Sequence, residues 1–106
     1  MKLGIIISTN NPEIIWNAFR LANLSLKERD EVKVFLLASG VEAEHCDSEQ
    51  FHITEQMNDF VFNKGIIYAC GTCLKIRNSD GTQLCPLSTM KDLYNIIHES
   101  DKVISF

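Results

Sequence analysis

The sequence has 106 residues, of which 45% are hydrophobic and 23% are charged, and its formal net charge is −4. This length predicts one domain, residues 1–106, which can bury about 65% of its unfolded surface in a single core. Lysine and arginine do not cluster, which argues against nucleic-acid binding through a positive surface, and no apolar run approaches the roughly 20 residues that span a membrane.

Four cysteines, Cys46, Cys70, Cys73 and Cys85, raise the main question of the sequence. The opening residues, MKLGIIISTNN, hold one lysine and a short apolar run, which is too little for the apolar core of a signal peptide. We therefore expect a cytoplasmic protein without a membrane segment, whose thiols stay reduced and do not form structural disulfides.

Apolar runs and helical patterns alternate along the first part of the chain. Leu3–Ile7 is a continuous apolar run, typical of a strand that is covered on both faces. Asn11 is a good helix N-cap with Pro12 at the first helical position, and the spacing of apolar residues predicts a helix that ends near residues 27–30. Val32–Ala38 is the second predicted strand.

The middle of the chain predicts a loop, a helix and a third strand. Residues 42–52 are polar and aperiodic, so we expect a loop there. The apolar spacing within Ile53–Val61 predicts a helix, and Gly65 is available for a left-handed cap at its C-terminal end. Ile66–Ala69 is the third predicted strand, and a short helix over residues 70–78 follows it.

The last quarter of the chain predicts a brief extended piece at residues 84–87, a helix and a final strand. Ser88 or Thr89 is expected to cap the helix, and Asp92 stands at the capping-box position relative to Thr89. The final strand is predicted over Lys102–Phe106.

Strands that alternate with helices predict an α/β fold: a parallel sheet of four or five strands with helices on both faces. Ligands of such sheets bind beyond the carboxyl ends of the strands, where the strand order reverses. With the first strand in the centre and the second and third strands on either side, Thr9 and Asn10 would lie beside Cys70.

Cys70 is the candidate nucleophile, because it stands where the third strand passes into a helix. Free backbone N–H groups and the positive end of the helix dipole favour a thiolate at that point. Lys75 and Arg77 add positive charge, and Gly71 permits a tight turn. Cys73, one helical turn later, is the candidate resolving thiol.

Other interpretations of the cysteines stay open at this point. Free cysteines are often buried as small apolar residues, and a Cys-x-x-Cys pair is also found in thiol–disulfide redox proteins. A metal site would need further ligands such as His45, Cys46 or Cys85, but the spacings match no zinc or iron–sulfur pattern. We therefore expect neither a metal nor a cofactor.

The chain as a whole resembles the DsrE-like family (DsrE/DsrF/TusD-type sulfur-relay proteins), in particular its small single-domain members. The resemblance rests on four segments that together cover nearly the whole sequence: STNNPEIIWNAFRLA, VKVFLLASGVEAE, GIIYACGTCLKIR and LCPLSTMKDLYNIIHESDKVISF.

The resemblance implies a flavodoxin-like three-layer fold and a homo-oligomer, either a trimer or a hexamer. It implies that Cys70 carries a persulfide, received from a sulfur-donor protein and passed to an acceptor protein, as in a sulfurtransferase or sulfur carrier. The pair Cys70–Cys73 suits the subgroup with two cysteines at this site. Trp16, Phe19 and Phe62 look exposed on predicted helices, which agrees with subunit contacts.

The resemblance also suggests which residues surround the sulfur. We expect the backbone N–H groups of Gly71 and Thr72 to hold the persulfide anion. The pocket is expected to be lined by Thr9, Asn10 and Gly40. Cys85 either approaches the same pocket or is a small buried residue.

Two alternative functions remain. One is a thiol–disulfide redox protein that uses Cys70 and Cys73. The other is a non-enzymatic oligomeric subunit that binds a small anion and whose cysteines are structural.

Overall fold

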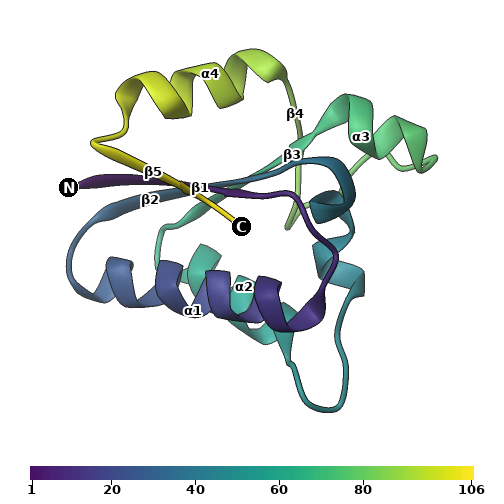
Figure 1. The fold of residues 1–106 in the computed structure, drawn as a ribbon, viewed down its shortest axis with the longest axis horizontal. Coiled ribbons are helices and arrows are strands. Elements are labelled where there is room, and N and C mark those ends of the chain that lie inside the picture. Colours follow the sequence, from purple (N-terminus) through teal and green to yellow (C-terminus); the bar gives the residue numbers. More distant parts are fainter.

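The computed structural model describes residues 1–106 and has a five-stranded sheet with helices on both faces (Figure 1). In chain order the elements are β1 (Lys2–Ile7), α1 (Pro12–Lys27), β2 (Glu31–Leu36), the 3-10 helix η1 (Ala38–His45), α2 (Ile53–Phe62), β3 (Ile66–Cys70), α3 (Gly71–Ile76), β4 (Leu87–Ser88), α4 (Met90–Glu99) and β5 (Lys102–Ser105). Every pair of neighbouring strands is parallel, so the predicted α/β class is confirmed.

The strand order is β4-β3-β2-β1-β5, which corrects the predicted arrangement around β1. The central strand is β2, and β1 has no contact with β3 through the sheet. Consecutive strands of β-α-β units tend to be neighbours, so β2 and β3 are each added on the same side, and only β5 returns to the other side of β1. Thr9 and Asn10 therefore do not adjoin Cys70 across neighbouring strands.

The helices form one layer on each side of the sheet: α1 and α2 cover one face, and α4 lies on the other (Figure 1). A Cβ at Gly4 would meet Ile96 and Ser100, so Gly4 faces α4. Gly4 is in register with Lys33, and Lys33 with Ile66, so these three residues share a face. Because side chains alternate along a strand, Cys70 points to the α4 side as Ile66 does.

The opposite face of the sheet carries most of the core. Ile5 and Val34 are fully buried beneath α1 and α2, and the rings of Phe19 and Phe60 meet edge to face at 5.7 Å between centroids. On the α4 side, Ile66 is still 46% exposed, because one ten-residue helix cannot cover five strands.

Two helix starts form as their sequences predict. The Asn11 side chain accepts a hydrogen bond from the Ile14 N–H at 3.1 Å, and Pro12 follows at the first helical position. Thr89 caps α4 and forms the full capping box with Asp92. Thr89, rather than Ser88, is therefore the cap.

Three local expectations are wrong. The predicted loop begins later, because η1 occupies residues 38–45. Lys64, not Gly65, adopts the left-handed conformation after α2 (φ 75°), and Gly65 instead packs its backbone against the Phe60 ring, where a side chain would clash. Phe19 is fully buried, whereas Phe62 is 87% exposed as expected.

Trp16 is partly buried and packs on Phe51 at 5.4 Å between ring centroids, with the Arg20 guanidinium over its ring. This contact explains Trp16 within the chain itself. No helix of the chain is both long and apolar enough to cross a membrane.

Candidate functional site

Cys70 is the last residue of β3 and the N-cap of α3. Its Sγ accepts a hydrogen bond from the Cys73 N–H at 3.5 Å, in the way a polar cap side chain does. The residue is only 4% exposed. Gly71 follows directly, and a Cβ there would lie 2.9 Å from the Leu87 side chain, so glycine lets α3 start close against β4.

Cys73 lies in the first turn of α3 and is partly exposed. Its Sγ accepts a hydrogen bond from the Ala38 N–H at 3.2 Å. Ala38 opens η1 with φ 52°, a left-handed conformation that is uncommon for a residue with a Cβ. Each sulfur of the pair thus accepts one backbone N–H, and both thiols are free.

Burial raises the pKa of the Cys73 thiol above its ordinary value, and a hydrogen bond to Cys70 and the charge of Cys70 raise it further. The Ala38 N–H and the Arg77 guanidinium act in the opposite direction and lower this pKa.

Arg77, just beyond the C-terminal end of α3, connects the pair to η1. Its Nε donates to the Glu42 carboxylate at 2.7 Å, and its Nη1 donates to the Cys73 carbonyl at 3.1 Å. Hydrogen bonds from Arg77 and, to a smaller extent, from the Asn10 side chain lower the pKa of Glu42. Arg77 thereby joins the end of α3 to η1 through Glu42.

Among the predicted pocket residues, Asn10 joins this cluster through Glu42, although its strand is not next to β3. Thr9 is used locally, because its Oγ1 accepts the Asn11 N–H at 3.1 Å at the start of α1. Gly40 is buried with its Cα against the Ile7 carbonyl, where a Cβ would clash with backbone. Thr72 is exposed beside the thiols.

Cys85 is 1% exposed in the segment before β4. Its N–H donates to Thr82 Oγ1 at 3.1 Å, and its carbonyl accepts the Thr82 N–H at 3.0 Å. Burial, and to a smaller extent the charge of Glu44, raise the pKa of Cys85 to about 12. Near neutral pH it is therefore a neutral buried thiol, which agrees with the small-buried-residue interpretation.

A groove of about 390 Å³ lies between η1 and α3, and Glu42, His45, Cys46 and Arg77 are among its lining residues, whereas Cys70 and Cys73 are not. The Cys46 thiol donates to the Glu42 carbonyl at 3.2 Å. Burial raises the pKa of Cys46, and the nearby charges of Glu42 and Asp47 raise it further. Cys46 is therefore a neutral thiol in an acidic groove.

Sequence reasoning did not identify Glu42 as a site residue. It pairs with a residue 35 positions away, and a single sequence carries no short-range pattern for such a contact. Histidine, cysteine and acidic side chains nowhere gather in a group of three or more that suits a metal ion.

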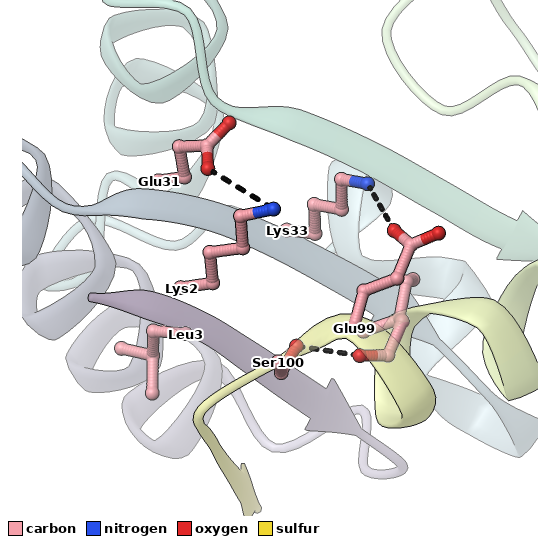
Figure 2. A pocket seen from close by; sticks show the side chains of 7 residues that line it. Lys2, Leu3, Glu31, Lys33, Glu99 and Ser100 are labelled. Atoms are coloured by element: carbon pink, nitrogen blue, oxygen red, sulfur yellow. Dashed lines mark hydrogen bonds and ion pairs between the residues drawn. The ribbon is translucent and has the colours of Figure 1, made fainter.

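A second pocket, of about 30 Å³, lies at the opposite end of the sheet, near the amino ends of β1 and β2. Figure 2 shows its charged side chains in pairs, with Lys2 directed at Glu31 and Lys33 at Glu99. The two N–O distances are 3.8 and 3.4 Å. This pocket contains no cysteine or histidine, so the thiol pair remains the candidate site.

The chain is similar to two archaeal proteins. It is 34% identical to the uncharacterized protein MJ0989 of Methanocaldococcus jannaschii, in an alignment of 115 residues that covers all of both chains. It is also 34% identical to the uncharacterized protein MK0008 of Methanopyrus kandleri, over 89% of this chain and 83% of that protein.

A solved structure with a similar fold is that of BT1422 from Bacteroides thetaiotaomicron, a conserved protein of unknown function. The TM-score is 0.78 at 16% sequence identity, over 99% of this chain and 94% of the other, so the likeness concerns the fold. The sequence profile of the DsrE/DsrF-like family matches residues 1–106. The protein therefore belongs to the DsrE/DsrF-like family.

Proposed function

We propose that the protein is a sulfur carrier that holds a persulfide on Cys70, with Cys73 as its second thiol. The observation that carries the proposal is the placement of Cys70 at the start of α3, with the Cys73 N–H on its sulfur, in a DsrE/DsrF-like chain. A backbone N–H directed at sulfur stabilises a thiolate or a persulfide anion more than the protonated form.

The transfer step exchanges one sulfur–sulfur bond for another. The Cys70 thiolate attacks the outer sulfur of a donor persulfide, R–S–SH; the S–S bond of the donor breaks, R–S⁻ leaves, and Cys70–S–SH forms. An acceptor thiolate then repeats the step on Cys70. No net oxidation or reduction occurs, and attack is most efficient when the thiol pKa is near the ambient pH.

The proposed partners are a sulfur-donor protein and a sulfur-acceptor protein. Gly71 and Thr72 are proposed to turn their N–H groups toward the persulfide, because they occupy the first two positions of α3. Thr9, Asn10 and Gly40 are also proposed as neighbours of the bound sulfur, and the support for Asn10 is that its side chain lowers the pKa of Glu42.

The test is intact mass spectrometry after incubation with glutathione persulfide, followed by peptide mapping. The wild type is expected to gain the mass of one sulfur atom on Cys70, and Cys70→Ser to lose this gain. Cys46→Ser is the matched control, because Cys46 is a partly buried thiol with a raised pKa, and it should load as the wild type does. Equal loading of Cys70→Ser and wild type would reject Cys70 as the carrier.

A thiol–disulfide redox protein is the second candidate function. It is favoured by the coupling of the two thiols, since Cys73 both donates its N–H to Cys70 and has its pKa raised by Cys70. Equilibration in glutathione buffers of graded redox potential should then give a reversible Cys70–Cys73 disulfide in the folded protein. If oxidation occurs only with unfolding, this candidate is excluded.

We also propose a homo-oligomer. The support is a stripe of exposed apolar side chains on α4, namely Met90, Tyr94 and Ile97, which are 60%, 57% and 50% exposed. All-parallel sheets are normally covered on both faces, whereas Ile66 on the α4 side of this sheet is 46% exposed. Light scattering coupled to size exclusion should give a trimer or hexamer mass, and a monomer mass would contradict this.

A further inference from the structure

The ion pair between Arg77 and Glu42 links η1 to α3 next to the thiol pair. The Nε–Oε2 distance is 2.7 Å, and the two side chains are 31% and 39% exposed. Exposed ion pairs usually contribute little to stability. The additional hydrogen bond from Arg77 to the Cys73 carbonyl, at 3.1 Å, makes this pair a bridge between two backbone segments.

At its Glu42 end, the bridge belongs to the same 3-10 helix, η1, whose first residue donates to the Cys73 sulfur. Glu42 lies four residues after Ala38 in η1, and Ala38 directs its N–H at Cys73 Sγ from a left-handed conformation. On the β1 side, η1 is tied down by the Leu37 N–H, which donates to the Ile7 carbonyl at 2.9 Å. On the α3 side, η1 is held by the bond from Arg77 to Glu42.

The charged groups that act on Cys73 come from three elements. Cys70 at the end of β3 raises its pKa, Arg77 after α3 lowers it, and Glu42 of η1 faces it only through Arg77. The Ala38 N–H also lowers this pKa, against the larger effect of burial. The Ala38 N–H and the Arg77 guanidinium therefore offset part of the rise in the Cys73 pKa that burial and Cys70 cause.

We propose that Arg77 is a positioning residue: its bridge from Glu42 to the Cys73 carbonyl holds the Ala38 amide on the Cys73 sulfur while that sulfur carries negative charge. This inference rests on the proposed function. It adds an internal step to that function: the Cys73 thiolate attacks the outer sulfur of Cys70–S–SH, the S–S bond of Cys70 breaks, and Cys73–S–SH forms while Cys70 leaves as a thiolate. The step moves sulfur from a buried residue to a more exposed one without net redox change.

The experiment measures iodoacetamide alkylation of each cysteine between neutral pH and about pH 11, resolved by peptide mass spectrometry. Arg77→Gln is expected to shift the Cys73 profile to higher pH by about half a unit or more, because the positive charge and the amide contact are both lost. Arg77→Lys should retain part of the wild-type profile. Lys75→Gln is the matched control, since Lys75 lies on α3 and has no ion-pair partner, and it should leave the profile unchanged.

Glu42→Gln separates positioning from plain electrostatics. Removal of a nearby negative charge by itself lowers a thiol pKa. We expect this for Cys46, because the charge of Glu42 raises the pKa of Cys46 in the wild type. Glutamine keeps an acceptor oxygen but loses the carboxylate charge, so it weakens the bond to Arg77. The weakened bridge should instead raise the Cys73 pKa, so the two cysteines should move in opposite directions in the same sample. A Cys73 profile that is unchanged, or shifted to lower pH, would overturn the proposal.

Failure of this inference differs from failure of sulfur transfer. Alkylation needs no persulfide, so the shifts in Arg77→Gln and Glu42→Gln are expected even in a protein that takes up no sulfur from glutathione persulfide. Sulfur loading of Cys70 with unshifted Cys73 profiles would reject only the role of Arg77. If Arg77→Gln does not fold in a urea titration, Glu42→Gln and Arg77→Lys decide the question.

Discussion

The two ends of the sheet both carry pairs of opposite charges, but they use them differently. At the amino end, Lys33 pairs with Glu99 at 3.4 Å, and neither group is hydrogen-bonded to a reactive residue (Figure 2). At the carboxyl end, Arg77 pairs with Glu42 and also donates to the backbone of Cys73. An ion pair of this protein therefore bears on the thiol chemistry only where it also holds backbone next to a cysteine.

The difference follows from the topology. The carboxyl ends of parallel strands release the chain into loops that lead to the next helix, and such loops bring polar side chains and free N–H groups together. Here they bring together η1, α3 and the residues after β1 (Figure 1). At the amino ends of the strands the chain arrives from the helices, and the charged side chains there form the isolated pairs Lys2–Glu31 and Lys33–Glu99.

A substitution at Gly40 tests how tightly the carboxyl end of the sheet is packed, and we expect it to lower stability more than any other change below. A Cβ at Gly40 would clash with the Ile7 carbonyl, which cannot move without disturbing β1. Gly40→Ala is expected to lower the free energy of unfolding by about 3 kcal/mol or more. Urea titration followed by circular dichroism measures this loss.

Gly4→Ala is the counterpart at the amino end. The added Cβ would lie 2.9 Å from side-chain atoms of Ile96 and Ser100, and it would not meet backbone as it does at Gly40. A loss of about 1 kcal/mol is expected there. Equal losses at the two glycines would contradict the idea that the carboxyl end is held by backbone contacts.

The pH dependence of stability distinguishes the buried Cys85 from the pair Cys70–Cys73. Its pKa is about 12 in the folded protein, against 9.0 ordinarily, so the folded state holds a proton that the unfolded state loses between these values. Stability from this group is complete below about pH 9 and is lost as the pH rises toward 12. At one pH unit per 1.36 kcal/mol, about 2 kcal/mol should be gone near pH 10.5.

The measurement compares urea titrations of wild type and Cys85→Ala at pH 8 and near pH 10.5. The stability advantage of the wild type over the variant should shrink by about 2 kcal/mol, because alanine has no proton to lose. A pH-independent difference would mean that Cys85 titrates normally, and its assignment as a buried structural thiol would then fail.

Several features of the two ends of the sheet could be predicted from the sequence. The caps at Asn11 and Thr89 were predictable because their partners lie within three residues. The position of Cys70 at the junction of a strand and a helix was predictable from an apolar run followed by a polar turn. Such signals are local, and local backbone preferences decide them.

The remaining features depend on contacts between distant segments. The direction in which each strand is added to the sheet leaves no local pattern, so β2 rather than β1 proved central. The bond between Glu42 and Arg77 spans 35 residues. Lys64 takes the left-handed conformation, and the contact of Gly65 with the Phe60 ring spans a turn of structure that a local pattern does not reveal.

A smaller effect is expected at the start of α4, which leaves the sheet from its carboxyl end. Thr89→Ala removes the hydroxyl that accepts the Asp92 N–H, leaves the backbone N–H of residue 89 on the Asp92 carboxylate, and should cost about 1 kcal/mol of unfolding free energy. Thr89→Ser keeps the hydroxyl acceptor and should stay close to the wild type in the same urea titration. A serine variant as weak as the alanine variant would assign the loss to packing of the Thr89 methyl group instead.

We expect the smallest change in stability when the Lys33–Glu99 pair at the amino end is removed. Lys33→Met removes the partner of Glu99, whose side chain is 52% exposed, and solvent screens such a pair. The free energy of unfolding should change by less than about 0.5 kcal/mol, and the pH profile of Cys73 alkylation should not move. Arg77→Gln, which also breaks one exposed ion pair, should change stability as little but shift the Cys73 profile. If both variants shift that profile equally, the effect reports the overall charge of the protein, and the bridge between η1 and α3 loses its special role.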